Sequence, residues 1–325
     1  MSEYKNIKGF KLQSLSSDPS SPFFGQTWYN STSCSLKASV ALAGVTAWTT
    51  GGAMATARRY LAGAGASNTA ALAFGGCAPP AVACTESYNG SAWTAGGALG
   101  TARYQLAGAG ASNTAALAFG GNGPSSCTES YNGTSWTAGG AMATARFNLA
   151  GAGTNTAALA FGGCTTTFTA CTESYNGSTW TAGGAMAIGR RGLAGAGTNT
   201  AALAFGGQCA GPINVTCTES YNGSTWSAGG ALGTARCGLA GAGTNTAALA
   251  FGGLSFTFSG CTESYNGSVW STSCVMNTAR CYLAGAGTNT AALAFGGGVS
   301  AGVAACTESY NVGSPTTCTR TITIS

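Results

Sequence analysis

Histidine is absent from this chain of 325 residues, and charged residues make up only 6% of it. Without histidine, the Ser-His and Cys-His pairs that activate a nucleophile are excluded, and so is every histidine-ligated metal. The fourteen cysteines show no CxxC spacing or Cys/His cluster, so a zinc site is not expected either. We therefore expect a protein that is not an enzyme and that has no cofactor and no metal.

Long apolar runs and clusters of charge are also missing. Gly, Ser, Thr and Asn interrupt every apolar stretch before it reaches the length that crosses a bilayer, so no membrane insertion is expected. The net charge of +5 is dispersed, which argues against nucleic-acid binding, and the polar Met1–Lys11 segment does not resemble a secretory signal. The hydrophobic content of 45% is still enough for a folded, soluble protein.

Six tryptophans recur every 43 to 46 residues, and the segment between them is nearly the same each time. Each copy reads GGAMATAR, LAGAG, TNTAALAFGG, a variable loop and then CTESYNG, with small changes. A period of this length without any helix-length amphipathic segment is typical of β-propeller blades with four short strands. The repeated tryptophans are Trp48, Trp93, Trp136, Trp180, Trp226 and Trp270.

Each repeat predicts four strands, which we letter a to d. Strand a covers RxxLAGAG, strand b TAALAFG, strand c TESYN, and strand d carries the tryptophan. The tiny residues of LAGAG suit the innermost strand, where neighbouring blades crowd together. Asn-Gly in five copies predicts a tight turn between strands c and d. We expect each tryptophan, and the phenylalanine of strand b, to fill the gap between adjacent blades.

These residues also resemble the kelch motif: a diglycine after an apolar strand, a Tyr and a Trp separated by a short turn, and an Arg before strand a. The resemblance covers residues 48–311 and recurs six times. It implies an all-β, six-bladed kelch-type β-propeller of four-stranded antiparallel blades. It implies no particular activity, because such propellers serve many functions.

The two ends of the repeat array complement each other. Trp48 has no TESYNG before it, whereas the last TESYN, Thr307–Asn311, has no tryptophan after it. We predict that the strand at Thr46–Thr49 completes the blade begun near Thr278, within a propeller domain of residues 41–325. The alternating Thr and Ile of the tail predict a peripheral strand in 316–325. In a competing closure, that tail itself takes the d position.

Charged residues of both signs occur once per repeat and predict six structural ion pairs. Because each repeat has one glutamate, the paired carboxylates of a glycosidase are not expected. An anion site formed by the ring of arginines is the alternative to structural pairing. The arginines are Arg58, Arg103, Arg146, Arg190, Arg236 and Arg280, and the glutamates are Glu86, Glu129, Glu173, Glu219, Glu263 and Glu308.

The cysteines suggest an oxidising final environment. Six of them share one repeat position on different blades, too far apart to bond each other, so each partner has to lie nearby. Adjacent loops supply Cys77 for Cys84, Cys164 for Cys171 and Cys209 for Cys217, and we predict a further disulfide between Cys34 and Cys318. Pairing stays open for Cys127, Cys237, Cys261, Cys274, Cys281 and Cys306, with Cys237–Cys261 and Cys281–Cys306 as one option.

Two kinds of position vary within this nearly constant framework: the two residues after each repeated arginine, and the loop between strands b and c. Strand alternation places both on one face of a propeller. This pattern favours a recognition face on a constant scaffold, with neutral drift of exposed loops as the alternative. The predicted ligand-binding residues are Arg59, Tyr60, Tyr104, Gln105, Phe147, Asn148, Phe168, Arg191, Phe256, Phe258 and Tyr282.

Residues 1–40 lie outside the repeat and predict an extended arm and a hairpin, with strands at Gln26–Tyr29 and through Lys37 around a turn at Asn30–Ser33. Residues Gly25, Gln26, Trp28, Tyr29, Asn30, Leu36 and Lys37 resemble a short hairpin near the start of structural and fibre proteins of tailed bacteriophages. The resemblance implies attachment to other virion proteins and a location on the virion, extracellular after release. We therefore expect an adhesin that recognises a host surface glycan or protein; the alternative is a structural virion protein without a host ligand.

Overall fold

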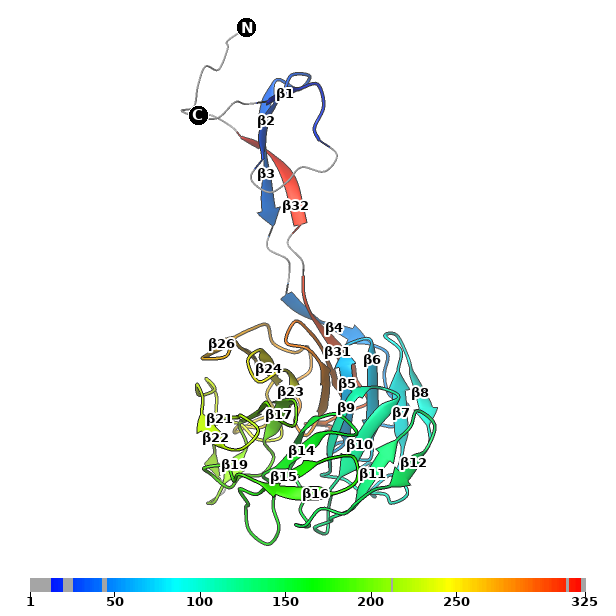
Figure 1. The fold of residues 1–325 in the computed structure, drawn as a ribbon. Coiled ribbons are helices and arrows are strands. Elements are labelled where there is room, and N and C mark those ends of the chain that lie inside the picture. Colours follow the sequence, from blue (N-terminus) through cyan, green and yellow to red (C-terminus); the bar gives the residue numbers. More distant parts are fainter. Residues whose placement is uncertain (1–12, 20–25, 43–45, 212, 314–315, 323–325) are drawn as a thin grey trace. The chain divides into compact units, whose positions relative to one another are not determined.

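The computed structural model describes residues 13–19, 26–42, 46–211, 213–313 and 316–322. The chain divides into two units. One comprises Met1–Thr46 with Val312–Ser325, and the other comprises Ala47–Asn311. All regular secondary structure in the described ranges is β-strand (Figure 1), so none of these residues forms a helix suited to crossing a membrane.

The larger unit contains six four-stranded sheets, each built from one repeat in the order predicted from the sequence. In the first, β5 (Ala62–Ser67), β6 (Ala70–Phe74), β7 (Thr85–Tyr88) and β8 (Trp93–Gly96) pair antiparallel in chain order. The next sheets contain β9 (Ala107–Ser112), β10 (Ala115–Phe119), β11 (Thr128–Tyr131) and β12 (Trp136–Ala138), then β13 (Ala150–Gly153), β14 (Ala158–Phe161), β15 (Thr172–Tyr175) and β16 (Trp180–Gly183).

The remaining three sheets repeat this order. They contain β17 (Ala194–Gly197), β18 (Ala202–Phe205), β21 (Thr218–Tyr221) and β22 (Trp226–Ala228); β23 (Ala240–Gly243), β24 (Ala248–Phe251), β25 (Thr262–Tyr265) and β26 (Trp270–Thr272); and β27 (Ala284–Gly287), β28 (Ala291–Phe295), β31 (Thr307–Val312) and β4 (Thr46–Gly51). Two b–c loops carry short hairpins, β19 (Gln208–Cys209) with β20 (Ile213–Asn214) and β29 (Gly298–Val299) with β30 (Gly302–Val303).

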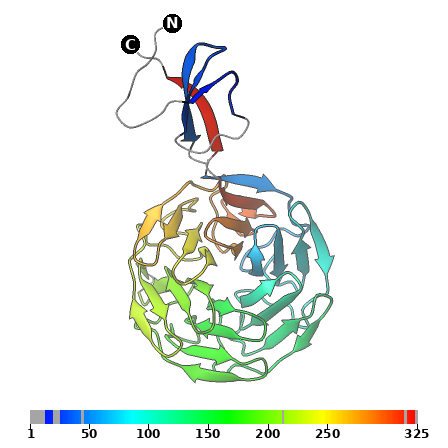
Figure 2. The ribbon, with the colours of Figure 1, turned by 45° about the horizontal axis from the view of Figure 1, so that its top comes forward.

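The innermost strands surround a common axis, as Figure 2 shows. Each a strand contacts the a strand of the next sheet, and β27 contacts β5, so that the series returns to its start. Glycine is required at these contacts. A Cβ added at Gly108 would lie 2.6 Å from the carbonyl oxygen of Gly63 and 2.7 Å from the ring of Phe74. The predicted crowding of LAGAG at the centre is thus confirmed.

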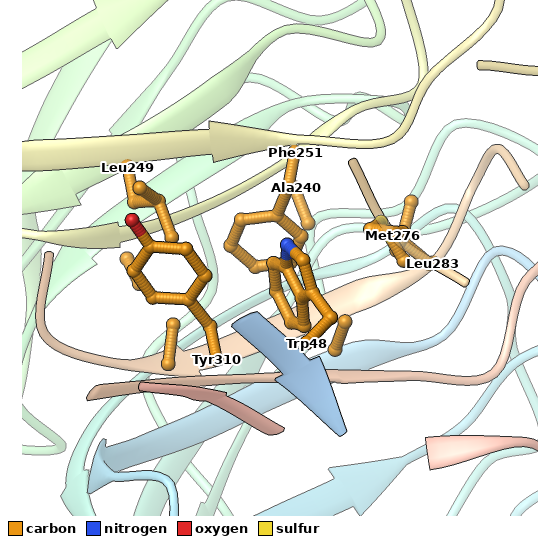
Figure 3. Close-up of a cluster of buried hydrophobic side chains, with 10 residues drawn as sticks. Trp48, Ala240, Leu249, Phe251, Met276, Leu283 and Tyr310 are labelled. Carbon is orange, nitrogen blue, oxygen red and sulfur yellow. The ribbon is translucent and has the colours of Figure 1, made fainter. Parts of the chain in front are cut away.

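Aromatic side chains fill the gaps between sheets, as expected. Trp48 lies within 5.1 Å of the Phe251 ring and 5.2 Å of the Tyr310 ring, centroid to centroid (Figure 3). Its indole Nε1 donates a 3.0 Å hydrogen bond to the hydroxyl of Thr262 in the neighbouring sheet. The same Trp-to-Thr bond recurs in the other five gaps, so the indole N–H in each gap has an acceptor.

The closing strand is where the sequence placed it, because β4 lies beside β31 in the sheet that contains β27 and β28. The prediction for the tail, in contrast, was wrong. Strand β32 (Thr316–Ile322) adds no peripheral strand to these six sheets but pairs antiparallel with β3 (Ser35–Leu42) over seven residue pairs. The competing closure fails too, since β4 already occupies the edge of β31. Residues 316–322 therefore belong with the N-terminal segment rather than with a 41–325 domain, and 323–325 lie outside the described residues.

The smaller unit is one sheet in the order β1 (Gln13–Leu15), β2 (Thr27–Asn30), β3 and β32. The predicted hairpin is present with a one-residue shift, as β2 and β3 flank a turn at residues 31–34. Trp28 is fully buried, and its Nε1 donates to Asp18 Oδ1 at 3.0 Å. Asn30 donates to the same oxygen at 2.7 Å. These two donors lower the pKa of the Asp18 carboxyl, and they attach the arm to the hairpin.

Candidate functional site

The two kinds of variable position lie together in the structure. The first residue after each repeated arginine pairs through its backbone with the start of the b–c loop of the same sheet, for example Arg59 with Cys77 and Phe147 with Cys164. Arg191 pairs likewise with Gln208, and the backbone N–H of Tyr104 donates an equivalent hydrogen bond to Asn122 Oδ1 at 3.1 Å. We call the surface made by these residue pairs and the b–c loops the variable face.

The second residue after each arginine lines the axis. Each of its backbone amides donates to the carbonyl of the equivalent residue in the preceding sheet, and six such bonds of 2.6–2.9 Å close a ring. All six residues have a positive φ between 51° and 61°. This ring, which we call the axial mouth, consists of Tyr60, Gln105, Asn148, Gly192, Gly238 and Tyr282.

A positive φ of this size is the left-handed region, which costs a residue with a side chain about 1–2 kcal/mol relative to the right-handed one. Glycine adopts it freely and occupies the position in two sheets, as Gly192 and Gly238. The side chains in the other four sheets are therefore not there to satisfy the backbone. Backbone strain of this kind is concentrated at functional sites, so the four side chains are candidates for a functional role.

Three tyrosines from neighbouring sheets lie at one side of the mouth, where Tyr60 and Tyr282 belong to the ring and Tyr104 lies beside it. The ring of Tyr60 lies 4.2 Å from that of Tyr282 and 6.0 Å from that of Tyr104, centroid to centroid. Burial raises the pKa of both Tyr60 and Tyr282, so their hydroxyls stay neutral and able to donate hydrogen bonds. Burial likewise raises the pKa of the Cys237 thiol, and that of the Cys281 thiol to about 12.

Gly192 and Gly238 add no side chain to the mouth, and the ring of Tyr282 lies over Gly238, where an added Cβ would be 2.6 Å from it. A cavity of about 80 Å³ is lined by the ring residues and the leucine that follows each of them. A second cavity of about 110 Å³ lies among the glycines and alanines of the innermost strands. Both are far smaller than the several hundred Å³ of a site that encloses a drug-sized ligand.

The remaining predicted residues lie around the mouth. Arg59 lies over the ring of Tyr60, with its guanidinium carbon 5.3 Å from the centroid, and Arg191 lies 4.8 Å from that of Phe168. Arg191 also donates to Gln208 Oε1 at 3.0 and 3.2 Å. Phe168 and Phe258 close their own loops by pairing with Cys164 and Leu254. Most of the predicted residues are half-buried, whereas Phe256 is fully exposed.

Sequence reasoning missed one contact between loops. Asn214 Nδ2 donates to the carbonyl of Leu254 at 2.9 Å, which joins the b–c loops of two neighbouring sheets. Ile213 beside it is exposed, as is Phe256 close to the acceptor. The varied lengths and compositions of these loops gave no signal for such a contact, because nothing in either segment identifies its partner.

No family model matches the chain, and no curated protein matches it. Among solved structures it is similar to YjhT, at a TM-score of 0.65 and 15% identity, over 79% of this chain and 96% of that one. Identity this low speaks for the fold alone. The fold is a β-propeller. Its repeated four-stranded sheets are the blades, and the axial mouth opens at its centre.

The six predicted ion pairs are present in the propeller, with N–O distances of 2.6–3.1 Å. In one of them, Arg146 and Glu173 are almost completely buried, and Glu173 Oε2 accepts the backbone N–H of Ala143 at 2.7 Å. Arg146 also donates to the carbonyls of Ala160 and Cys171. Each arginine thus connects strands b and c to the segment that joins strand d to strand a of the next blade. This structural role explains why the arginines are buried, without a bound ligand.

The predicted disulfides are not formed, because the thirteen cysteines with described side chains are all free thiols. Within the predicted pairs the thiols have other neighbours. Cys164 donates to the carbonyl of Thr165, and Cys209 donates to that of Ala210. The free thiols in these pairs are Cys77, Cys84, Cys164, Cys171, Cys209 and Cys217.

The Cys34–Cys318 disulfide is excluded by strand register. Strand β32 places Cys318 opposite Val40, whereas Cys34 lies six residues earlier in the turn before β3. Six residues of strand span about 20 Å, and a disulfide needs Cα atoms within about 7 Å. No group of three or more possible metal-binding side chains occurs in the described parts of the chain.

Proposed function

We propose that this protein is a six-bladed, kelch-type propeller that acts as a non-enzymatic binding scaffold on a bacteriophage virion, where its variable face recognises a host surface glycan. The observation that carries the proposal is the axial mouth. Four blades hold a tyrosine or an amide side chain in a left-handed conformation that glycine meets without strain in the other two. Binding is the reason we assign for keeping those side chains.

Six blades and the kelch type are supported by the six equivalent sheets, whose innermost strands contact one another in a series that returns to β5. The diglycine after strand b supports the kelch type as well. In the second blade, Gly120 and Gly121 both have positive φ, and a Cβ on Gly120 would lie 2.8 Å from the carbonyl of Arg146. The motif glycine is therefore needed where blades meet.

A glycan suits the chemistry of the mouth. Tyr60, Tyr104 and Tyr282 offer aromatic faces on which a sugar ring can stack, while Gln105 and Asn148 offer amide donors and acceptors. Because the cavity measures only about 80 Å³, a saccharide would lie across the face and insert one substituent. The backbone bridges that hold the loops reduce the entropy lost on binding.

The smaller unit is proposed as the attachment to other virion proteins. Its hairpin residues Trp28 and Asn30 hold the preceding arm through Asp18, and β32 adds a strand from the other end of the sequence to the same sheet. This sheet shares no strand with the propeller sheets, so anchoring through it requires no residue of the variable face. The protein would then be exposed on the virion and extracellular after release.

The test is binding of the purified, labelled protein to a panel of bacterial cells and to a glycan array. We expect saturable binding that falls at least tenfold in the double variant Tyr104→Ala, Phe147→Ala. The matched control is Val269→Ala, which removes an exposed apolar side chain from a c–d turn on the opposite face and should bind normally. Equal binding by both variants would overturn the proposed location of the site.

The alternative is a structural virion protein with no host ligand, which the two-ended sheet of the smaller unit favours. In that case, a variant without residues 1–40 should fail to enter particles, while the Tyr104/Phe147 variant should assemble and infect normally. A loss of infection with normal assembly in the Tyr104/Phe147 variant would favour the adhesin instead.

A further inference from the structure

Charge on the propeller is almost fully paired. The unit Ala47–Asn311 has eight arginines, six glutamates and neither lysine nor aspartate. Six of the arginines are buried with the six glutamates. The two that remain are Arg59 and Arg191, and both are the first residue after a repeated arginine, at the rim of the axial mouth. All net charge of this unit therefore lies on the variable face.

The two arginines lie on opposite sides of the mouth. Arg59 belongs to the blade of β5 and Arg191 to that of β17, three blades apart in the ring of six. Each guanidinium is positioned over an aromatic ring, Tyr60 or Phe168, at 5.3 and 4.8 Å. Such stacking orders a side chain that would otherwise lose entropy on binding a ligand.

Arg59 has unused hydrogen-bonding capacity. Its Nε is buried and has no hydrogen-bond partner in the described residues, so a ligand would reach the half-exposed guanidinium at its terminal nitrogens. The backbone amides at the mouth cannot bind an anion, because each already donates to the carbonyl of the equivalent residue in the preceding sheet. An anionic group at the mouth would thus be held by the arginine side chains, whose planar forks fit carboxylate and phosphate.

We infer that the variable face recognises an acidic saccharide, in which a carboxylate or phosphate pairs with Arg59, Arg191 or both while a sugar ring stacks on the mouth tyrosines. This inference rests on the proposed function and specifies its ligand class. The described side chains of the face supply no competing carboxylate, since the six propeller glutamates are buried beneath it in ion pairs. A repeating acidic polymer would reach both arginines.

The test uses the full chain and three oligosaccharides with the same backbone: one carboxylated, one phosphorylated and one neutral, made by reducing the carboxyl group. We expect the acidic forms to bind at least tenfold more tightly than the neutral one, and the preference between them identifies the source of the charge. Binding should weaken as salt rises from 50 to 500 mM, because a rim charge is screened. Equal binding of all three would overturn the inference.

Variants separate this inference from the proposed function. Arg59→Gln and Arg191→Gln should each remove most of the preference for acidic sugars and reduce the salt dependence, whereas Arg59→Lys should restore part of it. Neither residue belongs to a buried ion pair, so an unchanged thermal unfolding midpoint is the check on folding. Tyr104→Ala should weaken all three sugars equally. Suppose that the protein binds the neutral sugar as tightly as the acidic ones, that Tyr104→Ala removes this binding and that the arginine variants do not affect it. That result would contradict the acidic ligand but not the proposed function. If the folded protein binds no saccharide at all, both proposals are wrong.

Discussion

The backbone amide of Tyr282 donates a 2.6 Å hydrogen bond to the carbonyl of Gly238, and both residues have a left-handed conformation. One has a large aromatic side chain and the other has none, yet the ring continues through both. The backbone of the axial mouth is therefore the same with and without a side chain, although the Tyr282 ring lies so close to Gly238 that a Cβ there would be 2.6 Å from it. That constancy of the backbone allows one scaffold to carry a changing surface.

Replacing a mouth residue by glycine should stabilise the propeller. Gln105→Gly removes the energetic cost of holding a residue with a side chain in the left-handed conformation. Part of this gain is offset, because glycine has more conformational freedom in the unfolded chain. We expect a net gain of about 0.5–1 kcal/mol in the free energy of unfolding, measured by denaturant titration. Binding should fall in the same variant.

The matched control for this experiment is Gly192→Ala. A Cβ there would have its nearest neighbours at 3.4 and 3.6 Å, so space is sufficient and only the φ of +59° is unfavourable. We expect a loss of about 1 kcal/mol. A neutral effect of both substitutions would show that the left-handed ring stores no strain.

The sequence predicted the blades well because the repeat presents the same pattern six times. The tiny residues of LAGAG predicted the innermost strand, and the single Arg and Glu per copy predicted an ion pair. The incomplete ends at Trp48 and Thr307 identified the closing strand. The predictions that were wrong concern strands whose sequence indicates a strand but does not indicate which other strand it pairs with. The tail reads as a strand, but nothing in it identifies β3 as its neighbour.

The axial mouth was only partly predictable. Variation after each arginine indicated the residues that form the ring, yet Tyr and Gln carry no signal for a left-handed backbone, and Asn carries only a weak one. The glycines at 192 and 238, at the same repeat position, were the available signal. Disulfides failed for a related reason, since spacing along the chain does not determine where a thiol points. The Cys164 thiol, for example, donates to the carbonyl of Thr165.

The arm of the smaller unit should respond to acid. The pKa of Asp18 is lowered below its ordinary value of 3.8 by hydrogen bonds from Asn30 and Trp28. Because the folded-state pKa is depressed, the contribution of the carboxylate to stability is complete above 3.8 and is lost as the pH falls through the lower folded value. The Trp28 indole N–H resonance should shift in that window. In Asp18→Asn it should not titrate there, and an identical titration in both proteins would contradict the assignment.

Thiol reactivity should differ sharply across the propeller. Cys127 and Cys171 are exposed, whereas Cys237 and Cys281 are buried, and burial raises the pKa of Cys281 to about 12. Since the thiolate is the reactive species, brief alkylation of the native protein at pH 8 should label the first two and spare the second two. Peptide mass spectrometry measures this. Denatured, unreduced protein should be labelled at all four, and protected cysteines in that sample would indicate disulfides instead.

The Arg146–Glu173 pair allows the ion pairs to be tested as structural elements. Glu173→Gln leaves the Arg146 guanidinium buried without a counter-charge, so we expect a loss of about 3–5 kcal/mol in the free energy of unfolding. Arg146→Met should cost a similar amount, because the Glu173 carboxylate is then buried alone.

The double variant Arg146→Met, Glu173→Gln distinguishes charge from connectivity. It removes both charges, so it should be more stable than either single variant. Full recovery is not expected, because Arg146 also donates to the carbonyls of Ala160 and Cys171, and those bonds are lost with it. A double variant as unstable as the sum of the singles would mean that the two side chains act independently. Since the same pair recurs in every blade, that result would also remove the reason for regarding the other five arginine–glutamate contacts as coupled ion pairs.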